Sequence, residues 1–495
     1  MRILLIDPPF KVFTGYANNF FPIGLAILAA VLTKEGHEVK VLEVDKITMT
    51  NDINYSDEYK RLQLYVDGIN NDHHHIWGDI KKYLEEFRPD VIGLTVMTQK
   101  LGAAVKLAQI CKKWDASVPV IVGGAHPTLD PEQVLSSNDI DFAVRGEGEL
   151  VLPQLMKAIA AKSGFSGIGS LSYKKDGKVI NNPNCALIED LDIVPLPARE
   201  LLMNAQNYSS EDMGVIMTTR GCPYGCTYCF HMWARRVRYR SIDSVIKEIK
   251  LVKTNYGTRQ FAFKDDTFTI NRKRLFELLQ RMIDEKLNIN WECTTRVDVL
   301  DEEMLKKMIE AGCNVVKIGV ETGSPKILKE TNKGVTMEQI RKAAALLNKY
   351  NVFWSAYFMM GLPQETEEDI RSTYTFMKEL NPYYAGLGVY NPMPETELYD
   401  TGVKMGLLYE KVGLDHFFKV NPKDMYFKDP KKRVAQIDNE KFEKLANFMM
   451  DAFHKHNTKM INLVRRGWAR RRAYRSEPKM LASDIRKVIK WVVKV

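Results

Sequence analysis

Short apolar runs alternate with helical stretches along most of this chain, and each apolar run ends in polar or glycine residues. The first 150 residues contain predicted strands at 2–6, 39–42, 91–96 and 118–122, and predicted helices at 24–32 and 103–114. Strand-forming runs separated by helices indicate a parallel sheet that is covered on both faces. Right-handed crossovers would arrange this α/β region as a Rossmann-like, flavodoxin-like layer, which binds ligands beyond the carboxyl ends of its strands.

A second alternating series with a longer repeat follows. Its predicted strands lie at 215–219, 261–264, 290–295, 315–320, 354–360 and 386–389, and its predicted helices include 274–285 and 336–348. Six strands with intervening helices predict a partial (β/α)6 barrel that resembles a TIM barrel. Barrels of this kind place their chemistry at the carboxyl ends of the strands.

A chain of 495 residues is expected to form several domains. We expect a Rossmann-like domain over 1–150, a linker over 151–209, the partial barrel over 210–410 and a helical, basic region over 411–495. The linker contains a Val-Pro-Leu-Pro run, and apolar residues at helical spacing over 442–453 predict a packed helix in the last region.

The positive charge of the chain is concentrated near its end. The net charge is +9, and residues 459–495 contain twelve Lys or Arg but only two acidic residues. Tryptophan and aliphatic residues recur among these charges at helical spacing, which is typical of helices that bind membrane surfaces or anionic partners. The alternative is a solvated helix packed on the core. Nucleic acid is not an expected partner, because the sequence contains no recognisable RNA-binding module.

The sequence gives no sign of a membrane span or a secretory signal. No apolar run reaches the roughly 18 residues that a spanning helix needs, and the first residues resemble a buried strand rather than a signal peptide. We therefore expect a cytoplasmic protein that contacts at most the inner face of a membrane.

Three of the seven cysteines are clustered, because Cys222, Cys226 and Cys229 form a C-x3-C-x2-C pattern. Such thiolates can hold three irons of a [4Fe–4S] cluster and leave the fourth iron open to a small molecule. A structural zinc site would need four closed ligands, and His231 lies only two positions beyond the last cysteine. Disulfides are not expected in a long chain with an odd number of cysteines and no secretory signal.

The run from Arg220 to Phe230 resembles the signature of the radical S-adenosylmethionine (SAM) superfamily. The resemblance implies that the open iron binds the amino and carboxylate groups of SAM, which one electron from the cluster cleaves to a 5′-deoxyadenosyl radical. It also implies that Tyr228 lies near the adenine and that Phe230 belongs to the same cofactor-binding segment.

The barrel region resembles the same family at its strand ends, and the resemblance implies a set of SAM-binding residues there. They are Asp265, Asp266, Arg296, Glu321, Ser324 and Gly361. Asp265 and Asp266 stand where the family binds the amino group of SAM. Arg296 is placed to reach the carboxylate, for which a guanidinium offers a bidentate hydrogen bond. Glu321 and Ser324 stand where the family contacts the ribose or the carboxylate. The glycine of the Gly-Leu-Pro run stands beside the adenine, where a glycine lets the backbone approach closely.

The loops of the first region resemble the cobalamin-binding domain that precedes many radical SAM barrels. The matching pieces include the runs at 22–25, 89–93, 123–124 and 145–149. The expected cobalamin-binding residues are Asp7, Pro8, Pro9, Thr95, Thr98, Gly123, Gly124 and Glu147. The region has no G-x-G-x-x-G after its first strand, so a nicotinamide cofactor is not expected. It also lacks the D-x-H-x-x-G motif, so the resemblance implies cobalamin bound without a histidine ligand.

These resemblances imply an enzyme that uses SAM, a [4Fe–4S] cluster and cobalamin to methylate an unactivated carbon of a small or lipid-like substrate. Flavodoxin or ferredoxin would supply the electron. Oxidative cyclisation or rearrangement of a porphyrin-like or other hydrophobic substrate is the alternative reaction, and a non-enzymatic sensor is a third hypothesis. The sequence identifies no residue as the catalyst of methyl transfer.

Overall fold

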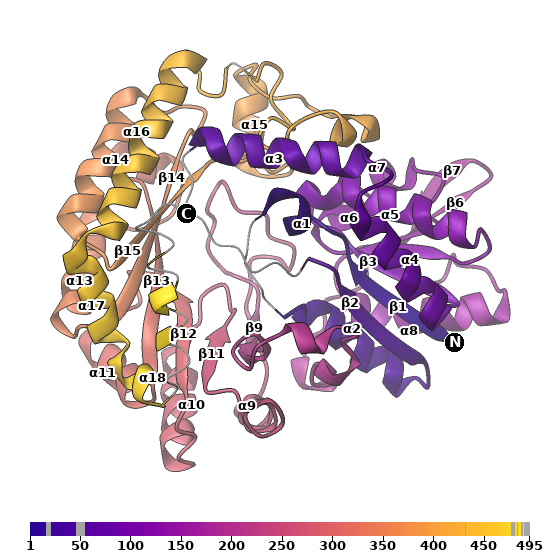
Figure 1. The fold of residues 1–495 in the computed structure, drawn as a ribbon, viewed down its shortest axis with the longest axis horizontal. Coiled ribbons are helices and arrows are strands. Elements are labelled where there is room, and N and C mark those ends of the chain that lie inside the picture. The colour runs from indigo at the N-terminus through magenta and orange to yellow at the C-terminus, as the bar shows by residue number, and fades with distance from the viewer. Residues whose placement is uncertain are drawn as a thin grey trace. The chain divides into compact units, whose positions relative to one another are not determined.

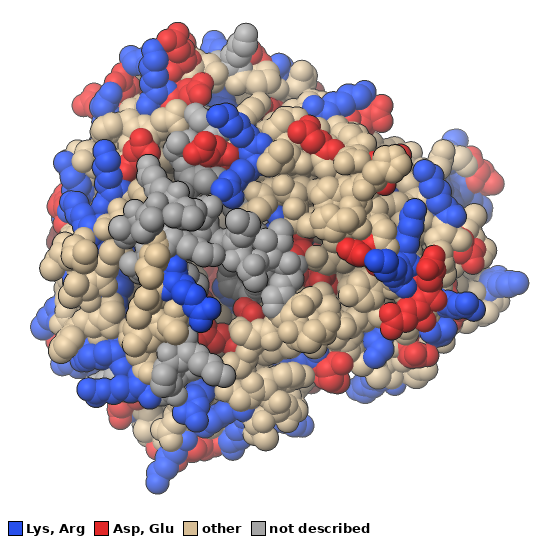
Figure 2. Space-filling model, viewed as in Figure 1, with Lys and Arg blue, Asp and Glu red and all other residues tan. Residues whose placement is uncertain are grey.

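A computed structural model describes residues 1–15, 21–45, 55–430, 432–476, 481–482, 484–486 and 489. The chain divides into two compact units (Figure 1). Unit 1 comprises Met1–Met49, Tyr59–Ser209 and Lys411–Met425, and unit 2 comprises Thr50–Glu58, Ser210–Glu410 and Tyr426–Val495. None of the described helices combines the length and apolar character that a membrane span requires. On the face in Figure 2, the described Lys and Arg side chains are interspersed with Asp and Glu.

Unit 1 is built on one seven-stranded sheet with the order β2-β1-β3-β4-β5-β6-β7. Its strands are β1 (Arg2–Asp7), β2 (Glu38–Glu43), β3 (Val91–Thr95), β4 (Val120–Gly123), β5 (Phe142–Val144), β6 (Leu171–Lys175) and β7 (Lys178–Asn181). The first five strands in sequence run parallel, and β6 and β7 are antiparallel. The order reverses between β1 and β3, which is where ligands bind in sheets of this type.

The helices of unit 1 include the two that the sequence predicts, which span 23–34 and 101–114. The described helices are α1 (Lys11–Thr14), α2 (Ile23–Lys34), α3 (Tyr55–Asn70), α4 (His75–Phe87), α5 (Leu101–Trp114), α6 (Ala125–Leu129), α7 (Pro131–Leu135) and α8 (Gly148–Ala161). On α4, Trp77, Ile80, Leu84 and Phe87 recur at helical spacing and are all buried. The Rossmann-like fold class predicted from the strand and helix pattern is therefore confirmed.

Two segments that the sequence analysis assigned elsewhere belong to unit 1. Residues 151–209, expected as a linker, contain most of α8 and the hairpin β6–β7, which extends the sheet beyond β5. Their short, half-exposed strands carry only a weak alternation of apolar and polar residues, so the pattern did not reveal them. Residues 411–425, expected in the helical basic region, pack against α5 through the buried Phe417.

Unit 2 contains a six-stranded, all-parallel sheet with the order β15-β14-β13-β12-β11-β8. These strands are β8 (Val215–Ile216), β11 (Gln260–Phe263), β12 (Asn290–Thr295), β13 (Cys313–Glu321), β14 (Phe353–Met360) and β15 (Tyr384–Val389). A separate antiparallel pair, β9 (Thr219–Arg220) and β10 (Arg238–Tyr239), flanks the cysteine run. The partial (β/α)6 barrel predicted from the sequence is confirmed.

The helices of unit 2 are α9 (Ile242–Tyr256), α10 (Arg272–Asp284), α11 (Glu302–Glu310), α12 (Pro325–Glu330), α13 (Met337–Lys349), α14 (Glu367–Leu380), α15 (Glu397–Lys404), α16 (Asn439–Thr458), α17 (Met460–Ala469) and α18 (Arg471–Ser476). Several of them lie on one face of this sheet, as Figure 1 shows for α10, α13, α14 and α16. Alternate strand residues such as Phe263, Trp291 and Trp354 are buried in the core on this face. The intervening residues point to the opposite face, which we call the inner face of the barrel.

Polar caps explain where the helices of unit 2 begin. Side chains of Ser, Thr, Asn or Asp accept a hydrogen bond from the first turn of α9 through α16. Thr336 with Gln339 and Thr366 with Asp369 form reciprocal capping boxes. Each cap contributes roughly 1 kcal/mol and fixes the point at which the chain leaves a strand end and enters a helix.

The last helices close the exposed edge of the sheet. Asn457 on α16 both accepts from the backbone N–H and donates to the carbonyl of Ala385 on β15, at 2.8 Å each. Arg466 on α17 is buried and donates to the carbonyl of Tyr383 at 2.9 Å. These contacts satisfy backbone groups that an edge strand would otherwise expose. The beginning of the basic region therefore packs on the barrel.

Candidate cofactor sites

The three clustered cysteines lie in the loop between β9 and β10 of unit 2. Cys226 is buried, Cys222 is partly buried and Cys229 is exposed. A hydrogen bond from the Cys229 thiol and the nearby charge of Lys333 lower the pKa of Cys226 to about 6, and burial opposes this shift. The same hydrogen bond and burial raise the pKa of Cys229. Cys226 and Cys229 thus lie side by side, and one of them already favours the thiolate form that binds metal.

The cysteine loop fits a cluster better than a single ion. In the described parts of the chain, no three His, Cys, Asp or Glu side chains converge closely enough to hold one metal ion. Each cysteine of a [4Fe–4S] cube binds a different iron, so three sulfurs spread along one loop match that donor set. The residues present therefore fit the cluster that the sequence predicts.

Backbone contacts from later segments fix the shape of the cysteine loop. Gly221 has φ +97°, and an added Cβ would lie 2.1 Å from the carbonyl oxygen of Arg236. Thr227 donates its N–H to the carbonyl of Thr331 at 3.0 Å and accepts from the N–H of Leu398 at 2.9 Å. These partners lie more than a hundred residues away in the sequence, so the loop takes this shape only in the folded barrel.

Asp265 anchors the strand that leads into the cysteines. Its buried carboxylate accepts hydrogen bonds from the backbone N–H groups of Thr218 and Thr219, at 2.7 and 2.6 Å, and from both hydroxyls, at 2.9 Å. Burial raises its pKa while these four donors oppose that shift. Asp265 is thus committed to protein contacts, although the sequence analysis expected it to bind SAM. The neighbouring Asp266 is exposed to solvent and interacts electrostatically with Cys222 and His231.

Arg296 lies beside the cysteine loop but is held by other protein groups. Its guanidinium stacks on the Tyr224 ring at 3.5 Å from the centroid. It donates to both carboxylate oxygens of Asp298, at 2.9 and 3.0 Å, and to the carbonyl of Lys333 at 2.7 Å. Arg296 therefore lies at the site, as expected, and at least part of its guanidinium is hydrogen-bonded to other protein groups.

Glu321 and Lys333 form a buried ion pair next to the cysteines. Glu321 has φ +71°, which is rare for a residue with a side chain, and lies at an irregularity in the pairing of β13 with β14. Its carboxylate contacts the Lys333 ammonium at 2.8 Å. Both groups interact electrostatically with Cys229, and Glu321 also acts on Tyr228. Strained backbone of this kind is concentrated at functional sites, and the SAM-binding role of Glu321 stays a prediction.

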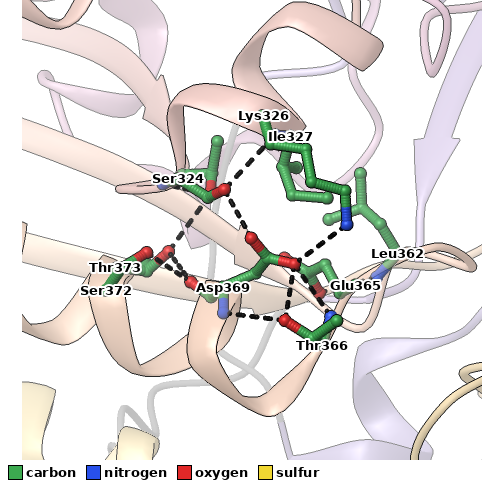
Figure 3. Close-up of polar contacts among 10 residues, drawn as sticks. Ser324, Lys326, Ile327, Leu362, Glu365, Thr366, Asp369, Ser372 and Thr373 are labelled. Carbon is green, nitrogen blue, oxygen red and sulfur yellow. Dashed lines mark hydrogen bonds and ion pairs between the residues drawn. The ribbon is translucent and has the colours of Figure 1, made fainter.

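Tyr228 and Leu362, the residue after Gly361, lie in one apolar patch next to the cysteine loop. Tyr228 packs against the cluster that contains Ile327, Leu362 and Leu398. Gly361 has φ +84°, and its N–H donates to the carboxyl of the buried Glu365 at 2.5 Å. Leu362 donates to the same Glu365 oxygen at 2.9 Å (Figure 3). A flat apolar surface beside a close backbone turn fits an adenine ring. Phe230, the last residue of the run, is partly buried.

Ser324 serves as a helix cap in the structure (Figure 3). Its hydroxyl accepts from the N–H of Ile327 at 3.3 Å and donates to Asp369 at 2.5 Å. Asp369 also accepts from the N–H and hydroxyl of Thr366, at 2.9 and 2.8 Å. Ser324 therefore joins α12 to α14, and its expected contact with SAM stays a prediction.

In unit 1, the expected cobalamin-binding residues gather at the carboxyl ends of the central strands. The ammonium of the buried Lys100 lies 2.6 Å from Asp7 and 3.7 Å from Asp45. Asp45 also accepts from the backbone N–H groups of Phe10 and Val12, which shape the loop after Asp7, Pro8 and Pro9. Burial raises the pKa of Asp7, and the two aspartates raise that of Lys100 against the opposing effect of burial.

The loops after β3 and β4 are fitted closely to each other. Gly124 has φ +106°, and an added Cβ would lie 3.1–3.2 Å from the Val96 backbone and the Thr95 hydroxyl. Thr98 contacts the buried His126 at 3.1 Å, and burial lowers the pKa of His126 to about 4, which keeps the ring neutral. Gly123, at the end of β4, leaves this loop without a side chain. The strand ends therefore present glycines and polar side chains, a combination that fits a large cofactor with polar edges.

Glu147 lies at the start of α8 and accepts from the N–H of Ile188 at 2.7 Å. This hydrogen bond joins residues 151–209, which were expected to form a linker, to the rest of unit 1. Sequence reasoning missed Lys100, Lys333 and Glu365. The only signal for these three residues in the sequence is that each stands after a recognised motif. That signal is weak, because no spacing or residue pattern marks the residues themselves.

Comparison with protein families agrees with both sites. The model described as the radical SAM superfamily matches residues 216–377, and the model described as the B12 binding domain matches residues 12–156. The first range contains the cysteine loop and strands β9 through β14 of unit 2. The second contains the strand ends around Thr95, Thr98 and Gly124.

Two curated proteins are similar to most of this chain. One is described as an uncharacterized methyltransferase, PH0819, of Pyrococcus horikoshii, and is 34% identical over 82% of this chain and 84% of its own length. The other is the anaerobic magnesium-protoporphyrin IX monomethyl ester cyclase of Rubrivivax gelatinosus, which is 30% identical over 85% of this chain and 72% of its own length.

Among solved structures, the fold resembles that of the radical SAM methyltransferase TsrM from Kitasatospora setae with cobalamin and a [4Fe–4S] cluster bound. The TM-score is 0.64 at 19% sequence identity, and the match covers 83% of this chain and 79% of that one.

Proposed function

Since this chain belongs to the cobalamin-dependent radical SAM enzymes, we propose that it transfers a methyl group from SAM to an unactivated carbon of a small or lipid-like substrate. The observation that carries this proposal is the cysteine loop at the barrel mouth, with the Cys226 thiol already shifted toward thiolate. The identity with a relative described as a methyltransferase over most of both chains supports methylation as the reaction.

The residues described above divide the binding tasks. Cys222, Cys226 and Cys229 would hold a [4Fe–4S] cluster, and the strand ends of unit 1 around Asp7, Thr98 and Gly124 would hold cobalamin. When bound, the cluster supplies the electron that cleaves SAM, and cobalamin supplies a carrier for the methyl group. Tyr228 and Gly361 would pack on the adenine of SAM, and Glu321, Arg296 and Asp266 would contact its polar groups. Asp265 positions the cysteine loop.

The proposed reaction is tested by anaerobic reconstitution with iron, sulfide and hydroxocobalamin. We expect the reduced protein to convert SAM to 5′-deoxyadenosine and S-adenosylhomocysteine. The variant with Cys222, Cys226 and Cys229 all replaced by alanine should not carry out the cluster-dependent reaction, so it should form neither product by this route. Cys185→Ala, a change of the same type in unit 1, should keep both. Full 5′-deoxyadenosine formation by the triple variant would contradict the proposal.

Oxidative ring closure is a second candidate reaction, because the cyclase from Rubrivivax gelatinosus is 30% identical over 85% of this chain. It predicts 5′-deoxyadenosine without S-adenosylhomocysteine. The ratio of the two products therefore separates the candidates. For either reaction, a flavodoxin or ferredoxin is the electron donor that we propose.

We also propose that α17 contacts an anionic membrane surface. Its side chains Met460, Val464 and Trp468 form a stripe at helical spacing and are 73%, 60% and 61% exposed. The opposite face of α17 packs on the barrel through Asn462 and Arg466. An exposed apolar stripe among arginines is typical of helices that lie on lipid headgroups.

Substitution tests the membrane contact without removing the packed face of α17. The double change Val464→Ser and Trp468→Ser should weaken binding to phosphatidylserine vesicles and leave binding to neutral vesicles low. Leu251→Ser, at an exposed apolar position of α9, serves as the control. Equal vesicle binding by both variants would remove the membrane proposal.

A further inference from the structure

The carboxylate of Glu321 lies over the backbone of its own strand. An added Cβ at Gly319 would overlap the Oε1 atom of Glu321 and lie 3.0 Å from the Nζ atom of Lys333. The ion pair between Glu321 and Lys333 therefore occupies the space that this glycine leaves. Gly319 does not have a positive φ, so its backbone conformation does not require a glycine. What requires the glycine is room for the ion pair.

One oxygen of this carboxylate is left for a ligand. Oε1 accepts a hydrogen bond from the Lys333 ammonium, and Oε2 forms no hydrogen bond with any residue that the structure describes. The Glu321 side chain is only 13% exposed, so the carboxylate is mostly shielded from water. A partly buried charged acceptor is stabilised by a hydrogen-bond donor. Glu321 is thus placed to accept a hydrogen bond from a bound molecule.

The backbone of Glu321 has a conformation that a glutamate does not favour. Its φ of +71° lies in the left-handed region, and the pairing of β13 with β14 is irregular at this point. A glycine would adopt this φ without strain. Strained positions persist only where the surrounding structure fixes them. Contacts made by the residues that follow Glu321 are therefore needed to hold it.

Thr373 and Ser372 of helix α14, both shown in Figure 3, supply these contacts. The Thr373 hydroxyl accepts a hydrogen bond from the N–H of Gly323 at 2.9 Å and lies 3.2 Å from the Thr322 hydroxyl. An added Cβ at Gly323 would overlap the carbonyl oxygen of Ser372, so the turn packs directly against the helix. Thr322 and Thr373 are buried. Thr373 thus fixes the two residues that come immediately after Glu321.

We propose that Gly319 and Thr373 are positioning residues, which hold the Glu321 carboxylate where its second oxygen, Oε2, accepts a hydrogen bond from SAM. Gly319 determines where the side chain lies, and Thr373 determines the backbone turn from which the side chain starts. Neither residue contacts SAM itself. This inference rests on the proposed function, because it explains how the SAM site of that enzyme is built.

The affinity for SAM measures this role in the reconstituted enzyme before reduction, when SAM is not consumed. Equilibrium dialysis with radiolabelled SAM gives the dissociation constant. Glu321→Gln should weaken binding about ten-fold, the loss of a hydrogen bond to a charged group. Thr373→Val and Gly319→Ala should each weaken binding about five-fold, because they displace the carboxylate without removing it. Thr373→Ser keeps the hydroxyl and should bind SAM as the wild type does.

Combination with Glu321→Gln separates positioning from a general loss of structure. Because Gly319 and Thr373 act through the carboxylate, adding Gly319→Ala or Thr373→Val to Glu321→Gln should weaken SAM binding by less than about two-fold further. Either change that keeps its full effect in the Glu321→Gln protein would refute the proposal for that residue. Wild-type affinity in the single variants would refute it as well.

Thr258→Val is the matched control. Thr258 is as buried as Thr373, but it lies just before β11, at the end of that strand opposite to the cysteine loop, and its hydroxyl donates to the carbonyl of Ser210 at 2.6 Å. This variant should bind SAM with unchanged affinity, and the iron content of every variant shows whether its cluster is assembled.

Failure of the positioning role and failure of the proposed function give different results. Cleavage of SAM by the wild type, together with unchanged SAM affinity in Thr373→Val and Gly319→Ala, would leave the function standing and remove the positioning role. A wild-type protein that does not bind SAM would overturn the proposed function and this inference with it.

Discussion

The carboxyl of Glu365 makes the stability of this protein depend on pH in a direction opposite to that of most carboxylates. Burial raises its pKa from the ordinary value of 4.5 to about 8, and hydrogen bonds from Leu362 and Gly361 oppose the shift only in part. One carboxyl oxygen accepts both N–H groups, and the other, Oε1, has no hydrogen-bond partner among the described residues. The folded protein therefore holds this group as the neutral acid at pH 7.

The sign follows from proton linkage. Between pH 4.5 and about 8, the folded state binds the Glu365 proton and the unfolded state does not. The free energy of unfolding then falls by about 1.4 kcal/mol for each pH unit as the pH rises through this window. Below it both states are protonated, and above it both are ionised, so the effect is absent at low pH and constant at high pH. From pH 6.5 to 8.5, Glu365 alone should lower the stability by about 2 kcal/mol.

Glu365→Gln isolates this contribution. A glutamine has the shape of the neutral acid, and its amide oxygen can accept both N–H groups, but it cannot ionise. The difference in the free energy of unfolding between the variant and the wild type should increase by about 2 kcal/mol from pH 6.5 to 8.5. Guanidinium unfolding followed by circular dichroism at the two pH values measures this difference. Parallel curves for the two proteins across this range would refute the neutral Glu365.

Three further changes test how the sites are held. Gly221→Ala should lose most of the bound iron, as measured by iron analysis. The alanine adds the strain of a positive φ, about 1–2 kcal/mol, and its Cβ would lie 2.1 Å from the Arg236 carbonyl oxygen. Normal iron content in this variant would contradict the role of the glycine. Asp265→Asn should reduce iron content and destabilise unit 2 by about 1–3 kcal/mol, since one amide oxygen cannot accept hydrogen bonds from all four donors. The control is Lys250→Gln, a change on the surface of unit 2. Phe417→Ala should cost about 3–5 kcal/mol in unit 1 and leave iron content unchanged, because the ring is buried and packs against the His126 ring. Unaltered unfolding would show that residues 411–425 do not stabilise this unit.

The amino-acid sequence predicted the cysteine loop and both sheets, apart from the hairpin β6–β7. Strands such as Asn290–Thr295 and helices such as α16 appear where apolar periodicity placed them. These features depend on local patterns, because alternation along a strand and spacing along a helix are written in neighbouring residues. The three cysteines are equally local, since their spacing alone limits the metal groups that they can hold.

Tertiary structure decided which polar side chains are available to ligands. Asp265 and Ser324 resemble ligand-binding residues in sequence, but their carboxylate and hydroxyl are used by Thr219 and Asp369, which are 46 and 45 residues away. Lys333 and Lys317 carry no motif, and only the folded barrel brings them next to Glu321 and Glu292. Motifs show which chemistry a chain can support, because ligand types and spacings are local. The partners of each charge are set by contacts between distant segments, and only the folded chain brings those segments together.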